Sequence, residues 1–341
     1  MGAELASIVI PVFNQLKYTK LCLESIMQNT DYPYELIFID NGSTDDTPEY
    51  LHKVHNARVI RNERNLGFPK AINQGIRESR GRYVVVLNND TLVTPSWLSR
   101  MVRCAERDER IGIVGVMTNS YVRGPQRDES ARYSGISELY TYAEERARKF
   151  ADKILLYPRV VAYAVLIKRE VFDIIGLFDE IFTPGNYEDD DFCIRALLAG
   201  FNVVVAEDVF IHHFGSKTFK GSRIPHEAIM DRNRRFFQEK WGSSPYDDVL
   251  LKKFRHLNEI HLVSIIMRTY NRPELLKEAV ASVLNQTYQH FELIVINDGG
   301  IDVWPLLEKF KDGRIVYVNC ERSLGPASAY NFGLIKARGE Y

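Results

Sequence analysis

Along the first 90 residues, short apolar runs alternate with segments in which hydrophobic residues recur with helical periodicity. Short apolar runs, each typical of a strand, occur at Ser7–Val12, Leu36–Ile39, Arg58–Ile60 and Tyr83–Leu87. Between them lie segments with helical periodicity, at 17–29, 48–54 and 69–79. We expect Thr47 to cap the second of these helices and Pro48 to be its first residue. The alternation predicts an α/β fold with a mainly parallel sheet flanked by helices.

The pattern continues with less regularity towards residue 241. Further strands are predicted at 112–116, 160–167, 202–206 and 209–213, and further helices at 169–175, 190–199 and 228–241. The stretch 121–150 is polar and rich in arginine, and its helical pattern begins late. We interpret this stretch as an insertion that covers one edge of the sheet.

An internal repeat organises the chain. The matching segments are 7–14 with 264–271 and 35–39 with 292–296, at the same displacement. A repeat of this length is typical of a duplicated domain. The predicted division is a complete domain at 1–241, a linker at 242–261 and the N-terminal half of a second domain at 262–341. Because this second copy stops before the counterpart of Asp90, we expect it to be truncated.

The composition is that of an ordinary globular protein. Hydrophobic residues make up 45% and charged residues 26%, and the net charge is −1, so nothing indicates a nucleic-acid partner. The four cysteines are far apart, which favours reduced thiols over a disulfide framework or a zinc cluster. The sequence has no apolar stretch long enough to span a membrane, and its first residues lack the basic-then-apolar pattern of a secretory signal. We therefore expect a cytoplasmic protein whose membrane contact, if it has any, is peripheral and at the inner face.

The most informative chemistry follows the strand Tyr83–Leu87. A continuous apolar run is typical of a strand buried on both faces, and open α/β sheets bind ligands beyond the carboxyl ends of such strands. Here the strand is followed by Asn88, Asn89 and Asp90. Asp90 is a candidate ligand of Mg²⁺ or Mn²⁺, and a single carboxylate predicts weak binding. The alternative, a turn built from Asn and Asp side chains, fits these three residues alone equally well.

Five further blocks of polar residues accompany this triplet. The six blocks are Pro11–Asn14, Asp40–Asp45, Asn65–Gly67 with Asn73–Gly75, Asn88–Asp90, Glu188–Asp191 and His212–His213. In order and spacing they resemble the family 2 glycosyltransferases with the GT-A fold, over about residues 5–241, and the first half recurs in 262–341. The triplet begins with asparagine, and in this respect it is similar to the triplet of the rhamnosyltransferase-like branch of the family.

The resemblance implies a role for each block. The nucleotide of the donor would be bound by Pro11, Val12, Asn14, Asp40, Asn41, Asn65, Gly67, Asn88 and Asn89. Among these, Asp40 would accept the imide N–H of a uracil or thymine ring. Asp90 and His213 would hold a divalent cation against the donor diphosphate, with His212 pointing to the opposite face of its strand. Asp189 would be the general base, and Glu188 would orient the acceptor.

The acidic run Glu188–Asp191 also has an interpretation from its residues alone. Acids at a helix N-terminus are favourable by roughly 0.3–1 kcal/mol each. Four acids in a row are more than stabilisation of the helix N-terminus requires. Crowded like charges raise one another's pKa, and a base that works near neutral pH needs such a raised pKa. We expect Asp190 and Asp191 to cap the helix and Arg195 to pair with Asp191.

These observations predict a metal-dependent, inverting glycosyltransferase of the hexosyltransferase type. Its donor would be a UDP- or dTDP-linked sugar and its acceptor a hydroxyl of a glycan or of a lipid-linked glycan, in polysaccharide biosynthesis. Residues 217–223 are basic and are expected to form a lid over the diphosphate. One alternative is a sugar-nucleotide nucleotidyltransferase, which would need a glycine-rich basic loop where Pro11–Asn14 lies. The other is a non-catalytic carbohydrate- or nucleotide-binding module, which describes the second copy better than the first.

Overall fold

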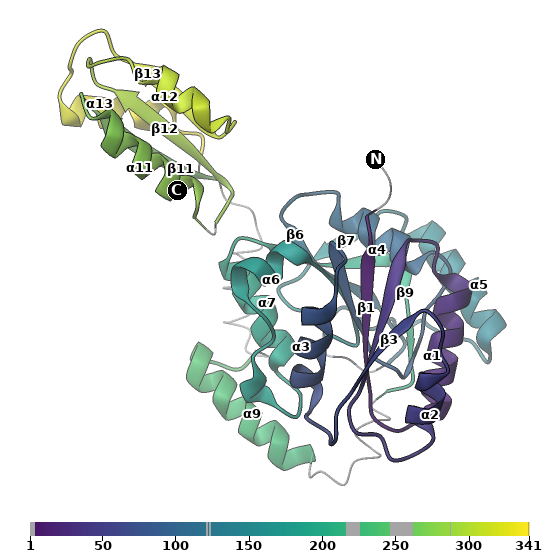
Figure 1. The fold of residues 1–341 in the computed structure, drawn as a ribbon. Coiled ribbons are helices and arrows are strands. Elements are labelled where there is room, and N and C mark those ends of the chain that lie inside the picture. Colours follow the sequence, from purple (N-terminus) through teal and green to yellow (C-terminus); the bar gives the residue numbers. More distant parts are fainter. Residues whose placement is uncertain are drawn as a thin grey trace. The chain divides into compact units, whose positions relative to one another are not determined.

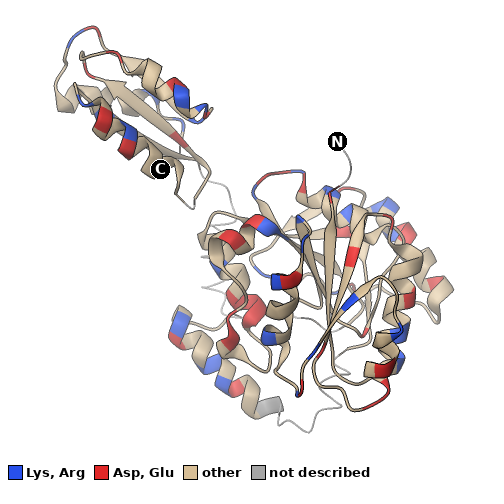
Figure 2. Cartoon of the chain, in the orientation of Figure 1, with Lys and Arg blue, Asp and Glu red and all other residues tan. Residues whose placement is uncertain are grey.

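A computed structural model describes residues 4–120, 122, 124–215, 226–245, 262–286, 288–339 and 341. The chain divides into two compact units, Met1–Asn258 and Glu259–Tyr341 (Figure 1). The predicted basic lid and the greater part of the predicted linker lie outside the described residues. Lys and Arg are interspersed with Asp and Glu over both units (Figure 2), in agreement with the small net charge. No helix within the described ranges is both long enough and apolar enough to cross a membrane.

The described part of the first unit is built on an eight-stranded sheet with the order β3-β2-β1-β4-β8-β6-β9-β7. The strands are β1 (Ala6–Val12), β2 (Tyr34–Asp40), β3 (Ala57–Arg61), β4 (Tyr83–Leu87), β6 (Ile111–Met117), β7 (Ile154–Leu156), β8 (Ala164–Lys168) and β9 (Asn202–Phe210). Strands β1 to β4 pair in parallel, as do β6 and β9. Strand β8 runs antiparallel between β4 and β6, and β7 is antiparallel to β9. The expected α/β fold with a mostly parallel sheet is confirmed.

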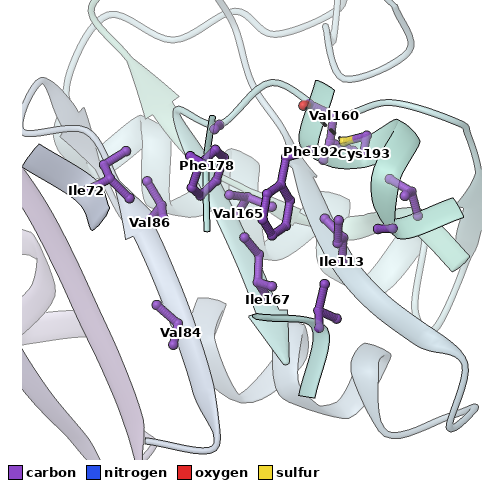
Figure 3. Close-up of a cluster of buried hydrophobic side chains, with 14 of the residues drawn as sticks. Ile72, Val84, Val86, Ile113, Val160, Val165, Ile167, Phe178, Phe192 and Cys193 are labelled. Carbon is purple, nitrogen blue, oxygen red and sulfur yellow. Dashed lines mark hydrogen bonds between the residues drawn. The ribbon is translucent and has the colours of Figure 1, made fainter. Parts of the chain in front are cut away.

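Helices cover both faces of this sheet (Figure 1). The described helices of this unit are α1 (Leu16–Asn29), α2 (Thr47–His52), α3 (Phe68–Glu78), α4 (Trp97–Ala105), α5 (Ile136–Lys149), α6 (Arg169–Ile175), η1 (Glu180–Phe182), α7 (Glu188–Leu198) and α9 (His226–Trp241). Every residue of β4 is buried. Val84 and Val86 join the apolar cluster on one face (Figure 3), whereas Tyr83, Val85 and Leu87 join the cluster on the other. A strand buried on both faces therefore needs the continuous apolar run that the sequence shows.

Some predicted boundaries are wrong. The N-cap of α2 is Asp46, and Thr47 lies inside the helix with a hydroxyl that has no hydrogen-bond partner among the described residues. Asp45, which precedes the N-cap, accepts a hydrogen bond from the Thr47 N–H at 3.0 Å, and the side chain of Asp46 makes no capping bond. Helix α7 begins at Glu188, two residues before its predicted start, and residues 160–163 precede β8 without belonging to it.

The region predicted to cover one edge contains α5, which packs against β9 next to the outermost strand β7. A buried ion pair between Arg146 of α5 and Asp128 attaches the preceding loop to this helix. Arg146 also donates a hydrogen bond from Nε to the carbonyl oxygen of Glu207 at 2.9 Å. Arginine in this region therefore ties the loop and the helix to the end of the sheet.

The second unit repeats the order of elements seen in the first 78 residues. The elements are β11 (Val263–Thr269), α11 (Pro273–Leu284), β12 (Phe291–Asn297), α12 (Trp304–Leu307), η2 (Glu308–Phe310), β13 (Ile315–Asn319) and α13 (Pro326–Lys336). The described strands form a parallel sheet in the order β11-β12-β13. Gly75 and Gly333 pack in the same way, because a Cβ on either would lie 2.4 Å from the side chain of Val9 or Ile266, respectively. The repeat therefore extends from sequence to helix–sheet packing.

Candidate active site

A cavity of about 710 Å³ opens beyond the carboxyl ends of β1 and β4 in the first unit. Sheets of this kind bind ligands at such ends. Of the residues predicted for the site, those that line this cavity are Pro11, Val12, Asn41, Asn65, Gly67, Asn88, Asn89, Asp90, Glu188, Asp189 and His213. Residues separated by more than a hundred positions in the sequence thus share one cavity.

Asp90 and His213 form a contact at the floor of the cavity. His213 Nε2 lies 3.1 Å from Asp90 Oδ1, and both side chains are nearly buried. Two short strands, β5 (Thr91–Leu92) and β10 (His212–His213), pair antiparallel and bring these residues together. The ring of Tyr163 stacks on His213 with centroids 5.2 Å apart. The orientation of the imidazole is therefore fixed by packing as well as by the carboxylate.

The chemistry of this pair fits a divalent cation of the Mg²⁺ or Mn²⁺ type. A carboxylate oxygen and an imidazole nitrogen are both suitable ligands, and cations that act on phosphates often take few ligands from the protein. The Nδ1 atom of His213 is buried and lacks a hydrogen-bond partner among the described residues. Within those residues, no group of three or more His, Cys, Asp or Glu is arranged so that it could hold a metal ion. The remaining ligands would therefore come from a diphosphate and water.

His212 lies away from this pair. Its Nδ1 is 2.6 Å from the hydroxyl oxygen of Tyr133, in the region that precedes α5. Burial lowers the pKa of His212 to about 4, and the neighbouring His213 contributes to that lowering. His212 is therefore neutral at physiological pH and attaches β10 to the covering region.

The acidic run enters the cavity at the first turn of α7. Glu188 is buried, and burial followed by the charge of Asp189 raises the pKa of Glu188 well above its ordinary value. Asp189 accepts hydrogen bonds from the N–H of Ala162 at 3.2 Å and of Asp190 at 2.9 Å. Burial raises the pKa of Asp189, while the charge of Arg159 opposes the rise. A carboxylate with a raised pKa suits a general base.

The next two acids are held by cations. Asp190 accepts a hydrogen bond from Arg159 Nε at 2.7 Å, and both side chains are buried. Asp191 forms the predicted pair with Arg195 at 2.8 Å and a second pair with Lys240 at 2.8 Å. The predicted pair of Asp191 with Arg195 is confirmed, but the predicted capping by Asp190 and Asp191 is wrong, because both lie inside α7 and its N-cap residue makes no side-chain capping hydrogen bond.

Two of the predicted nucleotide ligands do not line this cavity. Asp40 faces a second, shallower depression and accepts a hydrogen bond from the N–H of Ser43 at 2.9 Å. Its Oδ2 lies 3.6 Å from Arg61 Nε. Asn14 Oδ1 accepts a hydrogen bond from the N–H of Thr44 at 2.7 Å. Both side chains therefore hold the loop that follows β2.

Amide side chains elsewhere in the site also make internal contacts. Asn41 Oδ1 accepts a hydrogen bond from the N–H of Leu66 at 2.9 Å, and its Nδ2 donates to Asn65 Oδ1 at 2.9 Å. Asn89 Nδ2 donates to the hydroxyl of Thr19 at 2.9 Å. These residues line the cavity and shape its wall at the same time.

Gly67 permits a close approach between two loops. It has φ +85°, and a Cβ at this position would lie 2.7 Å from Pro184 Cα and 2.7 Å from Thr183 Cγ2. The N–H of Phe68 donates to the carbonyl oxygen of Pro184 at 2.8 Å. The glycine therefore lets the segment that leads to the acidic run pack directly on the start of α3.

Several residues of the cavity were not predicted from the sequence. Those with polar or aromatic side chains include Arg159, Tyr163, Asn186, Tyr187, Asp231 and Arg234. Four polar atoms at the cavity are buried and have no hydrogen-bond partner among the described residues, namely Asn88 Oδ1, Asn186 Nδ2, Glu188 Oε2 and His213 Nδ1. Such atoms are rare and call for an explanation such as a ligand.

Comparisons with known proteins identify the family. The family model described as "Glycosyl transferase family 2" matches residues 7–173 and 264–341. An uncharacterised protein, y4gI, from Sinorhizobium fredii is 31% identical over 72% of this chain and 28% of its own length. The hyaluronan synthase of Pasteurella multocida is 25% identical over 98% of this chain and 37% of its own length.

The solved structure of GalNAc-T7 with UDP, GalNAc and Mn²⁺ superposes with a TM-score of 0.51 at 19% identity, over 74% of this chain and 54% of that chain. At this identity the likeness shows a shared GT-A type of fold. The chain spans 28% to 60% of the length of the first curated relatives that it matches. With family matches over both units, the chain belongs to glycosyl transferase family 2.

Proposed function

We propose that the first unit is an inverting, metal-dependent glycosyltransferase that transfers a sugar from a UDP- or dTDP-linked donor to a hydroxyl of a glycan or lipid-linked acceptor. The observation that carries the proposal is that one cavity is lined by the Asp90–His213 pair and by the Asp189 carboxylate. The Asp90–His213 pair suits a cation bound to a diphosphate, and the Asp189 carboxylate suits removal of a proton from the acceptor. Family membership, the hyaluronan synthase relative and the fold shared with GalNAc-T7 support the same reaction class.

In the proposed reaction Asp189 accepts the proton of the acceptor hydroxyl while the hydroxyl oxygen attacks the anomeric carbon. The bond from that carbon to the diphosphate oxygen breaks, and the nucleoside diphosphate leaves with the electron pair. Attack from the face opposite the leaving group inverts the anomeric configuration. A cation held by Asp90 and His213 would neutralise charge on the diphosphate when bound. Glu188, one residue from the base, is proposed to orient the acceptor.

The nucleotide is proposed to lie at the carboxyl end of β1, at Pro11 and Val12, and beside Asn65 and Gly67. Asp40 remains the proposed partner of the base, although it faces the adjoining depression. Its Oδ2 accepts no hydrogen bond within the described residues, and an imide N–H is a donor of the kind that this oxygen lacks. Donor recognition would then extend from the cavity into that depression.

The proposed division assigns the complete transferase to residues 1–241 and half of a second, similar domain to 262–341. The asparagine at position 88 supports a dTDP-rhamnose donor as one specific candidate, because it resembles the rhamnosyltransferase-like branch. UDP-linked hexoses are the other candidates.

A donor panel tests the proposal. The full chain is incubated with UDP-, dTDP- and GDP-linked sugars, with Mn²⁺ or with a chelator, and the released nucleoside diphosphate is measured. We expect turnover of at least one UDP- or dTDP-linked donor that requires the cation and is lost in Asp189→Asn. Asp173→Asn, at an exposed acid of α6, is the matched control and should keep full turnover. Absence of turnover with every donor, or equal turnover in Asp189→Asn, contradicts the proposal.

A further inference from the structure

The segment that leads into the acidic run has an unusual backbone. Gly185, Asn186 and Tyr187 all have positive φ, at 154°, 75° and 77°. Residues other than glycine rarely adopt a positive φ, and such backbone conformations persist where the surrounding structure holds them. Because α7 begins at the next residue, this segment sets the direction from which Glu188 and Asp189 enter the cavity. Whatever holds the segment therefore positions the proposed base.

The holding contacts come from Asn233, a residue of α9. Its side chain is completely buried. Its amide nitrogen donates to the carbonyl oxygens of Phe182 at 2.6 Å, Gly185 at 2.9 Å and Asn186 at 3.2 Å. An amide has two N–H groups, so three backbone oxygens converge on two hydrogens. The neighbouring Arg232 donates to Asn233 Oδ1 at 2.8 Å, which fixes which end of the amide faces the loop.

The same side of α9 makes a second attachment to α7. The ring of Phe237 lies 5.7 Å from the ring of Tyr187. Trp241 Nε1 donates to Asp191 Oδ1 at 3.0 Å. Residues 233, 237 and 241 are spaced by four, so they share one face of the helix. Helix α9 lies beside α7 (Figure 1). It contacts η1 and, through Trp241 and Lys240, Asp191 in the first turn of α7.

We infer that Asn233 is a positioning residue that acts through the backbone of 182–186 to aim Asp189 at the cavity. Asn233 does not line the cavity, so it acts on the reaction without touching a substrate. The inference rests on the proposed role of Asp189 as the base. It assigns to α9 a role in positioning the base, in addition to its packing on η1.

The test replaces Asn233 with leucine, which has the same branched arrangement of side-chain heavy atoms and no hydrogen-bond donor. We expect Asn233→Leu to lower kcat by about ten- to a hundredfold, the scale for a small misplacement of a reacting group. KM for the donor should stay within about twofold, because the loops after β1 and β4 are unchanged. Arg235→Ala, at an exposed position of the same helix, is the matched control and should leave kcat unchanged.

Hydrogen–deuterium exchange supplies a readout that does not depend on activity. We expect faster exchange in the peptide covering 182–189 of Asn233→Leu and unchanged exchange in the peptides of β1 and β4. A second variant, Asn233→Ser, keeps one hydroxyl donor and should have a kcat between those of Asn233→Leu and the wild type. A wild-type kcat in folded Asn233→Leu overturns the inference. Loss of the folded state in both variants also overturns it, because Asn233 would then serve stability alone.

The design separates this inference from the proposed function. Asp189→Asn is measured in the same assay. If Asp189→Asn is inactive and Asn233→Leu has a wild-type kcat, the positioning role fails and the base assignment stands. If Asp189→Asn keeps wild-type turnover, the base assignment fails and the inference fails with it.

Discussion

Replacing Glu188 with glutamine should stabilise the protein at alkaline pH and not at acidic pH. Glu188 is buried, its Oε2 has no hydrogen-bond partner among the described residues, and three further acids follow it. Burial first, and then the charge of Asp189, raise the pKa of Glu188 well above the ordinary value of a glutamate. The folded state therefore holds this proton more tightly than the unfolded state does. Glutamine keeps the shape of the side chain and removes the charge.

The sign of the effect follows from linkage. Below the ordinary pKa of about 4.3 the carboxyl is protonated in both states and costs nothing. Above that value the unfolded state releases the proton first, so each further pH unit favours unfolding by about 1.4 kcal/mol until the folded state ionises too. Because the pKa in the folded state is raised above its ordinary value, Glu188→Gln should have a higher free energy of unfolding than the wild type at pH 8. The gain should shrink towards zero as the pH approaches 4.

Urea denaturation followed by tryptophan fluorescence measures this difference at pH 8, 6 and 5. Asp173→Asn, which removes an exposed acid, is the control and should change the free energy of unfolding little at any of these values. A Glu188→Gln gain that is the same at pH 5 and pH 8 would refute the reasoning, because it would have a cause other than the charge. A loss of stability at pH 8 would refute it as well.

Other predictions address the remaining parts of the site. Asp90→Ala should abolish Mn²⁺-dependent binding of nucleoside diphosphate and His213→Ala should weaken it, as calorimetric titration would show; equal affinities in Mn²⁺ would place the cation elsewhere. Gly67→Ala should cost about 2–4 kcal/mol in the free energy of unfolding, from an unfavourable φ and overpacking against Pro184, and an unchanged urea midpoint would contradict this. The fragment 1–258 should keep the donor turnover of the full chain, and loss of turnover in the folded fragment would assign part of the site to the second unit.

The sequence predicted those parts of the fold that depend on local patterns. The apolar run of β4 predicted a strand buried on both faces, and the repeat predicted matching elements in 262–341. The start of α7 was misplaced, because Tyr187 takes a left-handed conformation and offers no side-chain cap that a sequence pattern would reveal. The prediction that Thr47 caps α2 was wrong, because Asp46 is the N-cap and Asp45 accepts the hydrogen bond of the Thr47 N–H.

Site residues could be predicted from the sequence where a polar residue lies at the end of a predicted strand. Asp90 and His213 were expected near one ligand and lie 3.1 Å apart. Asn233 and Arg159 were missed, because their roles depend on partners far away in the sequence. Asn233, for example, has its acceptors about 50 positions earlier, at 182–186. Asp40 was expected in the same cavity as Asp90, but its carboxylate turns to the loop after β2.

The most direct test of the central claim is the anomeric configuration of the transferred sugar. Wild-type protein is given the donor that the panel identifies, a hydroxyl acceptor and Mn²⁺, and the first product is observed by proton NMR before it can equilibrate. The proposed direct attack, with Asp189 as base, predicts a product of inverted configuration and a loss of at least about a hundredfold in its rate of formation in Asp189→Asn. A product of retained configuration, or equal rates for the two proteins, would contradict the claim that this cavity performs a single displacement with Asp189 as its base.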